Sequence, residues 1–306
     1  MTIKVFGHMA PDTDSTGAPL IWAWYLSEIK GTPAEAKLLG EPNTEAAFVL
    51  ERWSLDKPEI IADVAAGDQV VIVDTNNPAE LPAGIGGADI LEIIDHHKLV
   101  GGLETSGPIN ITVRPVACTV TIMHDLMGDD AAKMPENIKG AMLSCILSDT
   151  LEFRSPTTTD ADKALAQSLA TDLGIDISAY SAEMFAAKSD VSAFSDAELI
   201  RMDSKKYEVG GTNFRVSVLE TTAPEIPLGR KASLIASMPE VAKEDGVDEV
   251  LLFVVDIIKE EATLLVPNDT VKAVAEKSFG ATVSGDSVVL PGIMSRKKQI
   301  IPNLAL

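Results

Sequence analysis

The amino-acid sequence predicts an α/β protein, with an N-terminal doubly wound, mostly parallel sheet and a smaller C-terminal mixed α/β domain. Short apolar segments of strand length alternate with helix-like segments through the first half of the chain. A polar stretch of small residues, 188–196, then follows a helical region and is typical of a linker. Beyond it the pattern changes, beginning with a hairpin signal at Gly210-Gly211.

The strands of the first domain are predicted at 3–7, 34–39, 69–73 and 89–94. The last two segments are apolar almost throughout, as expected of parallel strands buried on both faces. Helices are predicted over 15–30 and 44–53, and the chain turns helical between 118 and 180. Within that helical region Thr159 and Asp162 form a capping-box pattern before an apolar stripe.

The strands of the second domain are predicted at 205–209, 213–220, 249–258, 260–266 and 287–290, with helices at 232–244 and from about residue 268. The expected boundaries are 1–188 for the first domain, 189–195 for the linker and 196–306 for the second domain. The linker stretch could equally be a loop between two helices, although its small polar residues favour a linker.

The composition restricts the class of protein. The 306 residues carry a net charge of -21, so most of the surface would repel a nucleic-acid backbone. Cys118 and Cys145 lie in apolar helical contexts and are expected to be buried rather than paired or bound to zinc. The chain begins directly with a strand, and no apolar segment is long enough to span a bilayer. A soluble cytoplasmic protein without a membrane partner is therefore expected.

Metal-type side chains follow three of the predicted strands. They are, in chain order, His8, Asp12, Asp14, Asp74, Asp95, His96 and His97. A further acid, Asp149, follows an apolar helix. Ligands of open α/β sheets gather beyond the carboxyl ends of the strands, and imidazole mixed with carboxylate suits Mn, Co, Fe or Zn. Because these groups exceed the needs of one ion, two ions about 3.5–4 Å apart are expected.

Each of these residues also has an ordinary structural explanation. Asp12 and Asp14 could cap a helix or form a turn, and a lone His8 would more often be a satisfied buried histidine. Asp74 and Asp149 could be the acids of a turn and of a helix end. Asp-His-His at the end of a buried strand is harder to explain without partners. The joint pattern therefore favours a metal site.

The basic residues gather in Ser295-Arg296-Lys297-Lys298-Gln299, which contains three consecutive cations in an acidic chain. Such a run could be an ordinary solvated patch, as could Lys205-Lys206 on a surface strand. Together with metals on the first domain, it indicates an anionic substrate between the domains, where ligand sites are common. A phosphate ester or phosphoanhydride fits this arrangement, with a metal-bridged hydroxide attacking phosphorus while Arg and Lys neutralise the oxygens.

In their order along the chain, these motifs resemble those of the DHH phosphoesterase superfamily. The motifs are Gly7-His8-x-x-Pro11-Asp12-x-Asp14-Ser15, Val73-Asp74, Asp95-His96-His97 and Ser148-Asp149-Thr150. The ending from Ser295 to Gln299 is similar to that of the family II inorganic pyrophosphatases, and the resemblance spans nearly the whole chain. RecJ-type nucleases and oligoribonucleases of the same superfamily end in a motif rich in glycine and histidine, whereas this chain has no histidine after His124.

The resemblance implies a ligand set for two ions. One ion would be held by His8, Asp12 and Asp74, and the other by Asp14, Asp74, His96 and Asp149. The phosphate contacts would be His97, Lys205, Arg296 and Lys297, with Lys205 assigned by a looser match. The family's tight sites take Mn²⁺ or Co²⁺, and Mg²⁺ arrives with the substrate. Asp95 is expected to hold an imidazole rather than a metal.

The activity implied by the resemblance is hydrolysis of pyrophosphate to two phosphates by a cytoplasmic homodimer. Two alternatives stay open: a DHH-type phosphoesterase acting on short polyphosphate or a small nucleotide, and a non-catalytic, metal-dependent phosphate binder. Many family members carry His-Asn-Glu where this chain has Thr75-Asn76-Asn77, which could alter metal affinity. The chain has no room between 63–74 and 89–97 for an inserted regulatory module, so adenylate regulation is not expected.

Overall fold

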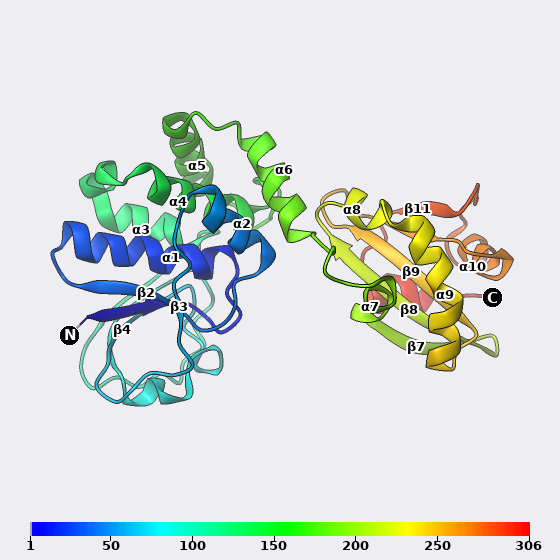
Figure 1. Ribbon diagram of the computed structural model, residues 1–306, viewed down its shortest axis with the longest axis horizontal. Coiled ribbons are helices and arrows are strands. Elements are labelled where there is room, and N and C mark those ends of the chain that lie inside the picture. The colour runs from blue at the N-terminus through cyan, green and yellow to red at the C-terminus, as the bar shows by residue number, and fades with distance from the viewer. Residues whose placement is uncertain (1) are drawn as a thin grey trace. The chain divides into compact units, whose positions relative to one another are not determined.

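The computed structural model describes residues 2–306, and the chain divides into two compact units between Ala187 and Lys188 (Figure 1). The first unit has a six-stranded sheet in the order β3-β2-β1-β4-β5-β6, and all neighbouring strands are parallel. Its strands are β1 (Ile3–Phe6), β2 (Ala34–Leu38), β3 (Glu59–Ile60), β4 (Gln69–Val73), β5 (Asp89–Asp95) and β6 (Asn110–Val113). The predicted parallel sheet is confirmed.

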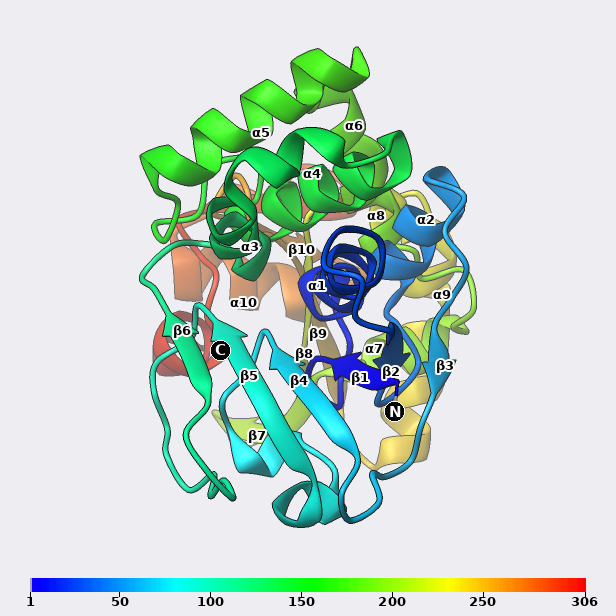
Figure 2. The ribbon, with the colours of Figure 1, turned by 90° about the vertical axis from the view of Figure 1, so that its left-hand side faces the viewer.

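Helices cover one face of this sheet, and short helical turns cover the other. The elements are α1 (Thr13–Trp24), η1 (Tyr25–Ile29), α2 (Thr44–Arg52), η2 (Pro78–Glu80), η3 (Ala83–Gly87), α3 (Thr119–Met127), η4 (Gly128–Lys133), α4 (Glu136–Thr150), α5 (Asp160–Leu173) and α6 (Ile177–Lys188). Val5 and Val71 share a core with α1, α3 and α4, which Figure 2 shows on one side of the strands. The alternate residues Phe6 and Ile72 point to the opposite face and pack with Ile85 of η3.

The order of the strands explains where a ligand site can form. β1 and β4 are neighbours, with Val5 opposite Val71. The chain continues from β1 to β2 on one side and from β4 to β5 on the other, so the order reverses between them. Ligands of such sheets bind beyond the carboxyl ends of the strands at this switch point. His8 follows β1 and Asp74 follows β4, so the predicted ligands lie there.

Two glycines allow the close contacts that fix the position of α1. A Cβ atom on Gly17 would overlap Sγ of Cys145 in α4, so the two helices can touch only because glycine stands here. A Cβ atom on Gly7 would overlap the hydroxyl of Ser15, which accepts a 2.8 Å hydrogen bond from the His8 amide. The start of α1 is thereby held against the end of β1 and against α4.

The second unit has a five-stranded sheet in the order β11-β10-β9-β8-β7, in which the β8–β9 pair is parallel and the other pairs are antiparallel. Its elements are α7 (Asp196–Met202), β7 (Ser204–Val209), β8 (Thr212–Thr221), α8 (Glu225–Leu228), α9 (Lys231–Asp245), β9 (Glu249–Asp256), β10 (Glu261–Leu265), α10 (Asp269–Phe279), β11 (Ser287–Pro291), η5 (Arg296–Ile300) and η6 (Ile301–Asn303). Leu251 and Phe253 of β9 pack with α10, whereas Leu252 and Val254 pack with α7 and α9.

The local predictions can be compared with these elements. The hairpin at Gly210-Gly211 is confirmed by the antiparallel pairing of β7 and β8, and the capping box of Thr159 and Asp162 is present at α5. The helix predicted over 15–30 consists of α1 followed by the π-helix η1. The short strands β3 and β6 were not predicted. Within residues 2–306, no helix is long and apolar enough to cross a membrane.

The stretch predicted as a linker, 189–195, lies within the second unit and is hydrogen-bonded to other segments of that unit. The Thr221 hydroxyl donates a 2.7 Å hydrogen bond to Ser189. Nη1 of Arg230 donates to the carbonyls of Val191 and Phe194, at 3.0 and 2.8 Å. The boundaries 189–195 stay a prediction.

Candidate metal centre

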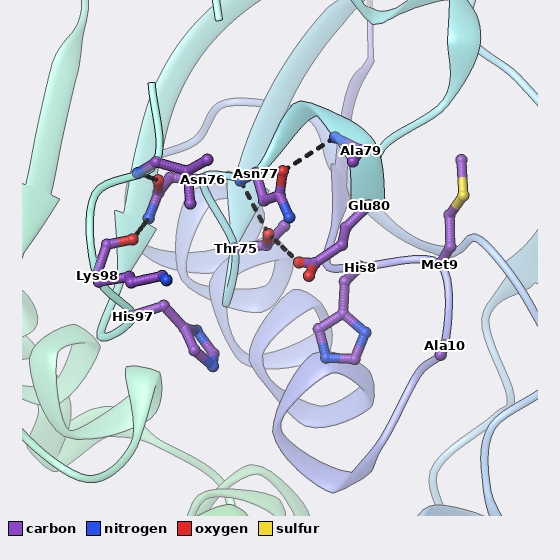
Figure 3. Close-up of a pocket in the computed structure, with 11 residues that line it drawn as sticks. His8, Met9, Ala10, Thr75, Asn76, Asn77, Ala79, Glu80, His97 and Lys98 are labelled. Carbon is purple, nitrogen blue, oxygen red and sulfur yellow. Dashed lines mark hydrogen bonds between the residues drawn. The ribbon is translucent and has the colours of Figure 1, made fainter. Parts of the chain in front are cut away.

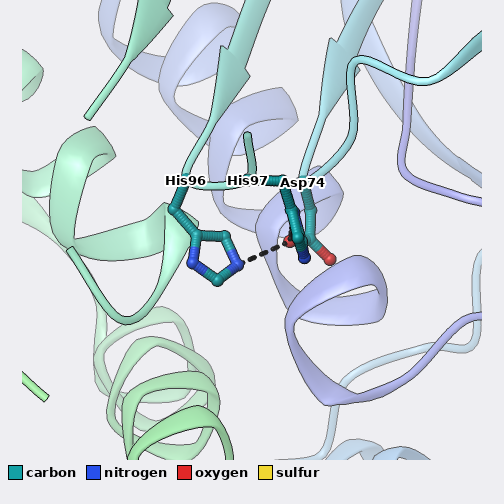
Figure 4. A group of neighbouring side chains, drawn as sticks. All are labelled: Asp74, His96 and His97. Atoms are coloured by element: carbon teal, nitrogen blue, oxygen red, sulfur yellow. Dashed lines mark ion pairs between the residues drawn. The ribbon is translucent and has the colours of Figure 1, made fainter. Parts of the chain in front are cut away.

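Asp74 is the central residue of the candidate site. It follows β4 with a φ of 57°, a left-handed conformation that Asp adopts more readily than most residues. Its amide donates a 2.9 Å hydrogen bond to the Ile94 carbonyl, and only 1% of the residue is exposed. Oδ2 lies 3.5 Å from Nε2 of His8. Oδ1 lies 3.3 Å from Nε2 of His96, the ion pair drawn in Figure 4. One buried carboxylate therefore faces two groups of potential ligands.

The first group consists of His8, Asp12 and Asp74, whose ligand atoms lie within 4.8 Å of one another. Asp12 is also the N-cap of α1, because its Oδ1 accepts a 3.0 Å hydrogen bond from the Ser15 amide. Its Oδ2 lies 3.8 Å from Nε2 of His8. Capping a helix and binding a cation are thus compatible for Asp12, because different oxygens serve the two purposes.

The second group consists of Asp14, His96 and Asp149, with ligand atoms also within 4.8 Å. Oδ2 of Asp14 accepts a 2.8 Å hydrogen bond from the Thr119 amide, whereas its buried Oδ1 has no hydrogen-bond partner among residues 2–306. Nδ1 of His96 lies 3.2 Å from the Val116 carbonyl. Because a carbonyl can only accept, Nδ1 carries the proton and the lone pair of Nε2 points into the site.

His97 is oriented by Asp95, as predicted for that acid. Nδ1 of His97 lies 2.9 Å from Oδ1 of Asp95, and the same oxygen accepts a 3.0 Å hydrogen bond from the His97 amide. Asp95 is fully buried, and its other oxygen accepts a hydrogen bond from the Asn76 amide group. The His97 side chain itself is 53% exposed. The exposed side of the ring can therefore reach a ligand, while the His97 amide and Nδ1 are held by the buried carboxylate of Asp95.

A pocket of about 400 Å³ opens beside the first group (Figure 3). It is lined by residues after β1, β4 and β5, namely His8, Met9, Ala10, Thr75, Asn76, Asn77, Ala79, Glu80, His97, Lys98 and Val100. In Figure 3 the rings of His8 and His97 point in the same direction. The Thr75 hydroxyl donates a 2.7 Å hydrogen bond to Glu80, which keeps this carboxylate at the pocket.

The carboxylates of the centre repel one another. Burial, followed by the charges of Asp14 and Asp12, raises the pKa of Asp74 well above its usual value. Burial lowers the pKa of His8, but the hydrogen bond and charge of Asp12 more than offset it and the pKa is raised. The hydrogen bond to Asp95 raises the pKa of His97, against an opposing effect of burial. Raised pKa values at both the carboxylate and the imidazoles are expected where negative charges gather without a cation to balance them.

The residues present fit divalent cations. A buried carboxylate oxygen without a partner, such as Oδ1 of Asp14, is costly unless something compensates it. Imidazole nitrogen combined with several carboxylate oxygens suits Mn²⁺ and similar borderline ions. The two groups, joined by Asp74, offer enough ligand atoms for two ions.

The predicted anion contacts Lys205, Arg296 and Lys297 belong to the second unit, on β7 and η5. Nη1 of Arg296 donates a 2.7 Å hydrogen bond to the Asp203 carbonyl, and Nη2 lies 2.7 Å from the Asp203 carboxylate. This contact brings η5 to the start of β7, two residues from Lys205. Gln299 shapes the basic run, since its Oε1 accepts hydrogen bonds from two backbone amides before it.

Two polar residues at the centre were not predicted from the sequence. Thr119, the first residue of α3, donates its amide to Asp14 and its hydroxyl, at 3.2 Å, to Asp74. Glu45 of α2 is fully buried and accepts hydrogen bonds from hydroxyls beside the predicted ligands. Neither belongs to a motif that sequence spacing could reveal, and only the folded chain brings them to the site.

Comparisons with known proteins identify the family of the chain. The DHH family, N-terminal domain, matches residues 2–148, and the DHHA2 domain matches residues 182–305. A Deinococcus radiodurans protein named "Probable manganese-dependent inorganic pyrophosphatase" is 41% identical over 99% of this chain and 97% of its own. This chain belongs to the manganese-dependent inorganic pyrophosphatases, family II of the inorganic pyrophosphatases.

Other family members show the same extent of similarity. A Lactobacillus johnsonii protein with the same name is 36% identical over 98% of this chain and 96% of its own. A crystal structure from Methanococcus jannaschii, titled "putative family II inorganic pyrophosphatase", has a TM-score of 0.63 and 34% identity. It covers 99% of this chain and 98% of its own. The similarity therefore includes both units of the chain.

Asn76, in the segment Thr75-Asn76-Asn77, has a structural role. The Asn76 side chain donates to Asp95 and, at 3.0 Å, to the Lys98 carbonyl. It also accepts a 2.7 Å hydrogen bond from the Val100 amide. The turn after Asp74 is thus tied to the segment that carries the two neighbouring histidines.

We expect the affinity for Mn²⁺ to fall as the pH is lowered. The raised pKa values of Asp74 and His8 mean that these groups hold protons at higher pH than usual in the metal-free protein. An incoming cation must displace those protons, so binding weakens as they become harder to remove. Titration calorimetry at about pH 6 and about pH 8, in buffers of different ionisation enthalpy, measures affinity and released protons. Equal affinity at both pH values, with no proton release, would contradict the expectation.

Proposed function

We propose that this protein hydrolyses inorganic pyrophosphate to two orthophosphates at a site for two divalent ions. The observation that carries the proposal is the position of Asp74, whose two oxygens lie 3.5 and 3.3 Å from His8 and His96. A carboxylate shared in this way is the usual bridge of a two-ion site. The names of the relatives, which cover nearly the full chain, support the substrate and the metal.

The ligand assignment follows the two groups of side chains. One ion would be held by His8, Asp12 and Asp74, and the other by Asp14, Asp74, His96 and Asp149. We propose Mn²⁺ or Co²⁺ for these sites and Mg²⁺ as the ion that accompanies the substrate. A bound pair of divalent ions supplies Lewis acidity, which polarises phosphoryl oxygens and makes water a nucleophile near neutral pH.

The chain's own residues would bind and orient the substrate. The exposed ring of His97, fixed by Asp95, can donate to a phosphoryl oxygen. Lys205, Arg296 and Lys297 would supply further positive charge, and Arg can hold two oxygens at once. Charge placed where oxygens gain negative charge lowers the barrier to phosphoryl transfer. The same groups could accept short polyphosphate, which is the nearest alternative substrate.

Purified protein with Mn²⁺ and Mg²⁺ should release phosphate from pyrophosphate far faster than from tripolyphosphate or a dinucleotide. A chelator should abolish the activity, and Mn²⁺ should restore it, because the proposed nucleophile depends on the ions. Phosphate release is measured colorimetrically with each substrate at the same concentration. Turnover of tripolyphosphate alone would favour the polyphosphatase alternative, and phosphate binding without turnover would favour a phosphate binder.

Arg296→Ala should reduce kcat/KM for pyrophosphate by about 10²–10³-fold, because it removes charge from the developing transition state. The metal content should stay unchanged, since Arg296 belongs to neither ligand group. Lys298→Ala is the matched control, because it removes a neighbouring cation that the proposal does not place on the substrate. Steady-state kinetics and metal analysis separate the two effects. A loss of bound metal in Arg296→Ala would contradict the assignment.

We also propose a homodimer formed through β6. This strand is an edge of the sheet and pairs with β5 alone in the described part of the chain. Its Ile111 and Val113 are 56% and 36% exposed, an apolar edge of the kind that pairs with another strand.

Light scattering should give twice the chain mass of 32.4 kDa. Ile111→Lys should give the mass of one chain; a wild-type monomer would contradict the proposal.

The cytoplasmic location stays a prediction.

A further inference from the structure

Glu45 is a fully buried acid that lies outside every motif of the site. It stands in the first turn of α2, where the Asn43 side chain caps the helix. Its Oε2 accepts a 2.9 Å hydrogen bond from the Thr13 hydroxyl and a 2.7 Å hydrogen bond from the Ser148 hydroxyl. Burying a carboxylate costs free energy, and Asn43 already caps the helix, so the burial of Glu45 needs another explanation.

The two hydroxyls belong to the segments that carry ligands of the proposed second ion. Thr13 stands directly before Asp14, and Ser148 stands directly before Asp149. The two segments are far apart in the chain, one at the start of α1 and the other near the end of α4. A single oxygen of Glu45 therefore joins them, and both hydrogen bonds are buried.

The geometry points to Glu45 as a positioning residue that sets the separation of Asp14 and Asp149. This inference rests on the proposed two-ion site, but it concerns only where the ligands are held. A rigid pair of ligand-bearing segments binds an ion more tightly than a pair that must be brought together on binding. Partners that hold ligands in this way typically change metal affinity about 10–100-fold when they are lost.

Two conservative variants separate the reach of Glu45 from its charge. Glu45→Gln keeps an oxygen at the same distance from the backbone but removes the charge. Glu45→Asp keeps the charge but withdraws it by one methylene, so that one oxygen cannot reach both hydroxyls. Positioning predicts Mn²⁺ affinity within about threefold of wild type for Glu45→Gln and a loss of about 10-fold or more at one ion for Glu45→Asp.

Glu92→Asp is the matched control. Glu92 is a half-buried acid whose Oε2 accepts a 2.9 Å hydrogen bond from the Trp22 indole of α1, and it belongs to none of the candidate ligand groups. Shortening it should lower the melting temperature without changing Mn²⁺ affinity. Mn²⁺ binding is measured by titration calorimetry on the folded, metal-free proteins, and thermal unfolding is followed in parallel.

Two results would overturn the inference. Glu45→Asp could bind both ions as tightly as wild type, whatever its melting temperature, which would leave Glu45 a purely structural residue. Alternatively, Glu45→Gln could lose as much affinity as Glu45→Asp, which would show that charge rather than position is responsible. A wild-type protein that binds two ions without cleaving pyrophosphate would sink the proposed activity, while the comparison of the Glu45 variants would still stand.

Discussion

The burial of Asp74 among other carboxylates is the constraint on which the first unit depends. The residue is almost fully enclosed, and the charges of Asp14 and Asp12 add to burial in raising its pKa. The β1–β4 switch point makes this enclosure possible, because two neighbouring strands end there while their connections leave in opposite directions. A sheet with the same composition and a different strand order would separate His8 from Asp74. Strand order is thus as much a part of the site as the ligands are.

Small residues and amides keep the carboxylates from moving apart. Gly7 and Gly17 let α1 approach β1 and α4 more closely than any side chain would allow. Asn76 ties the turn after Asp74 to the segment after β5. The repulsion between the acids is therefore opposed by contacts of the backbone and of neutral side chains. Metal binding would relieve the repulsion rather than create the site, because the candidate ligand groups already lie together in the folded chain.

The sequence predicts those residues of the centre that directly follow a strand. His8, Asp74 and His96 follow apolar segments, and strand ends of a parallel sheet meet at one edge. Glu45 could not be predicted in the same way, since an acid in the first turn of a capped helix is ordinary. Strands β3 and β6 were missed for another reason. They are short and partly exposed, so they lack the apolar run that indicated β4 and β5.

The buried acids of the first unit fall into two kinds, which their sequence does not distinguish. Asp95 accepts hydrogen bonds at both of its oxygens, from the side chains of Asn76 and His97. Asp162 is similar, with donors from Thr121, Thr159 and a backbone amide. Asp14, in contrast, keeps an oxygen that no donor in residues 2–306 satisfies. Carboxylates that the protein satisfies can hold neighbouring segments in place, whereas those it leaves unsatisfied are available to a cation. Hydrogen bonds at both oxygens, rather than the residue type, distinguish Asp95 and Asp162 from Asp14.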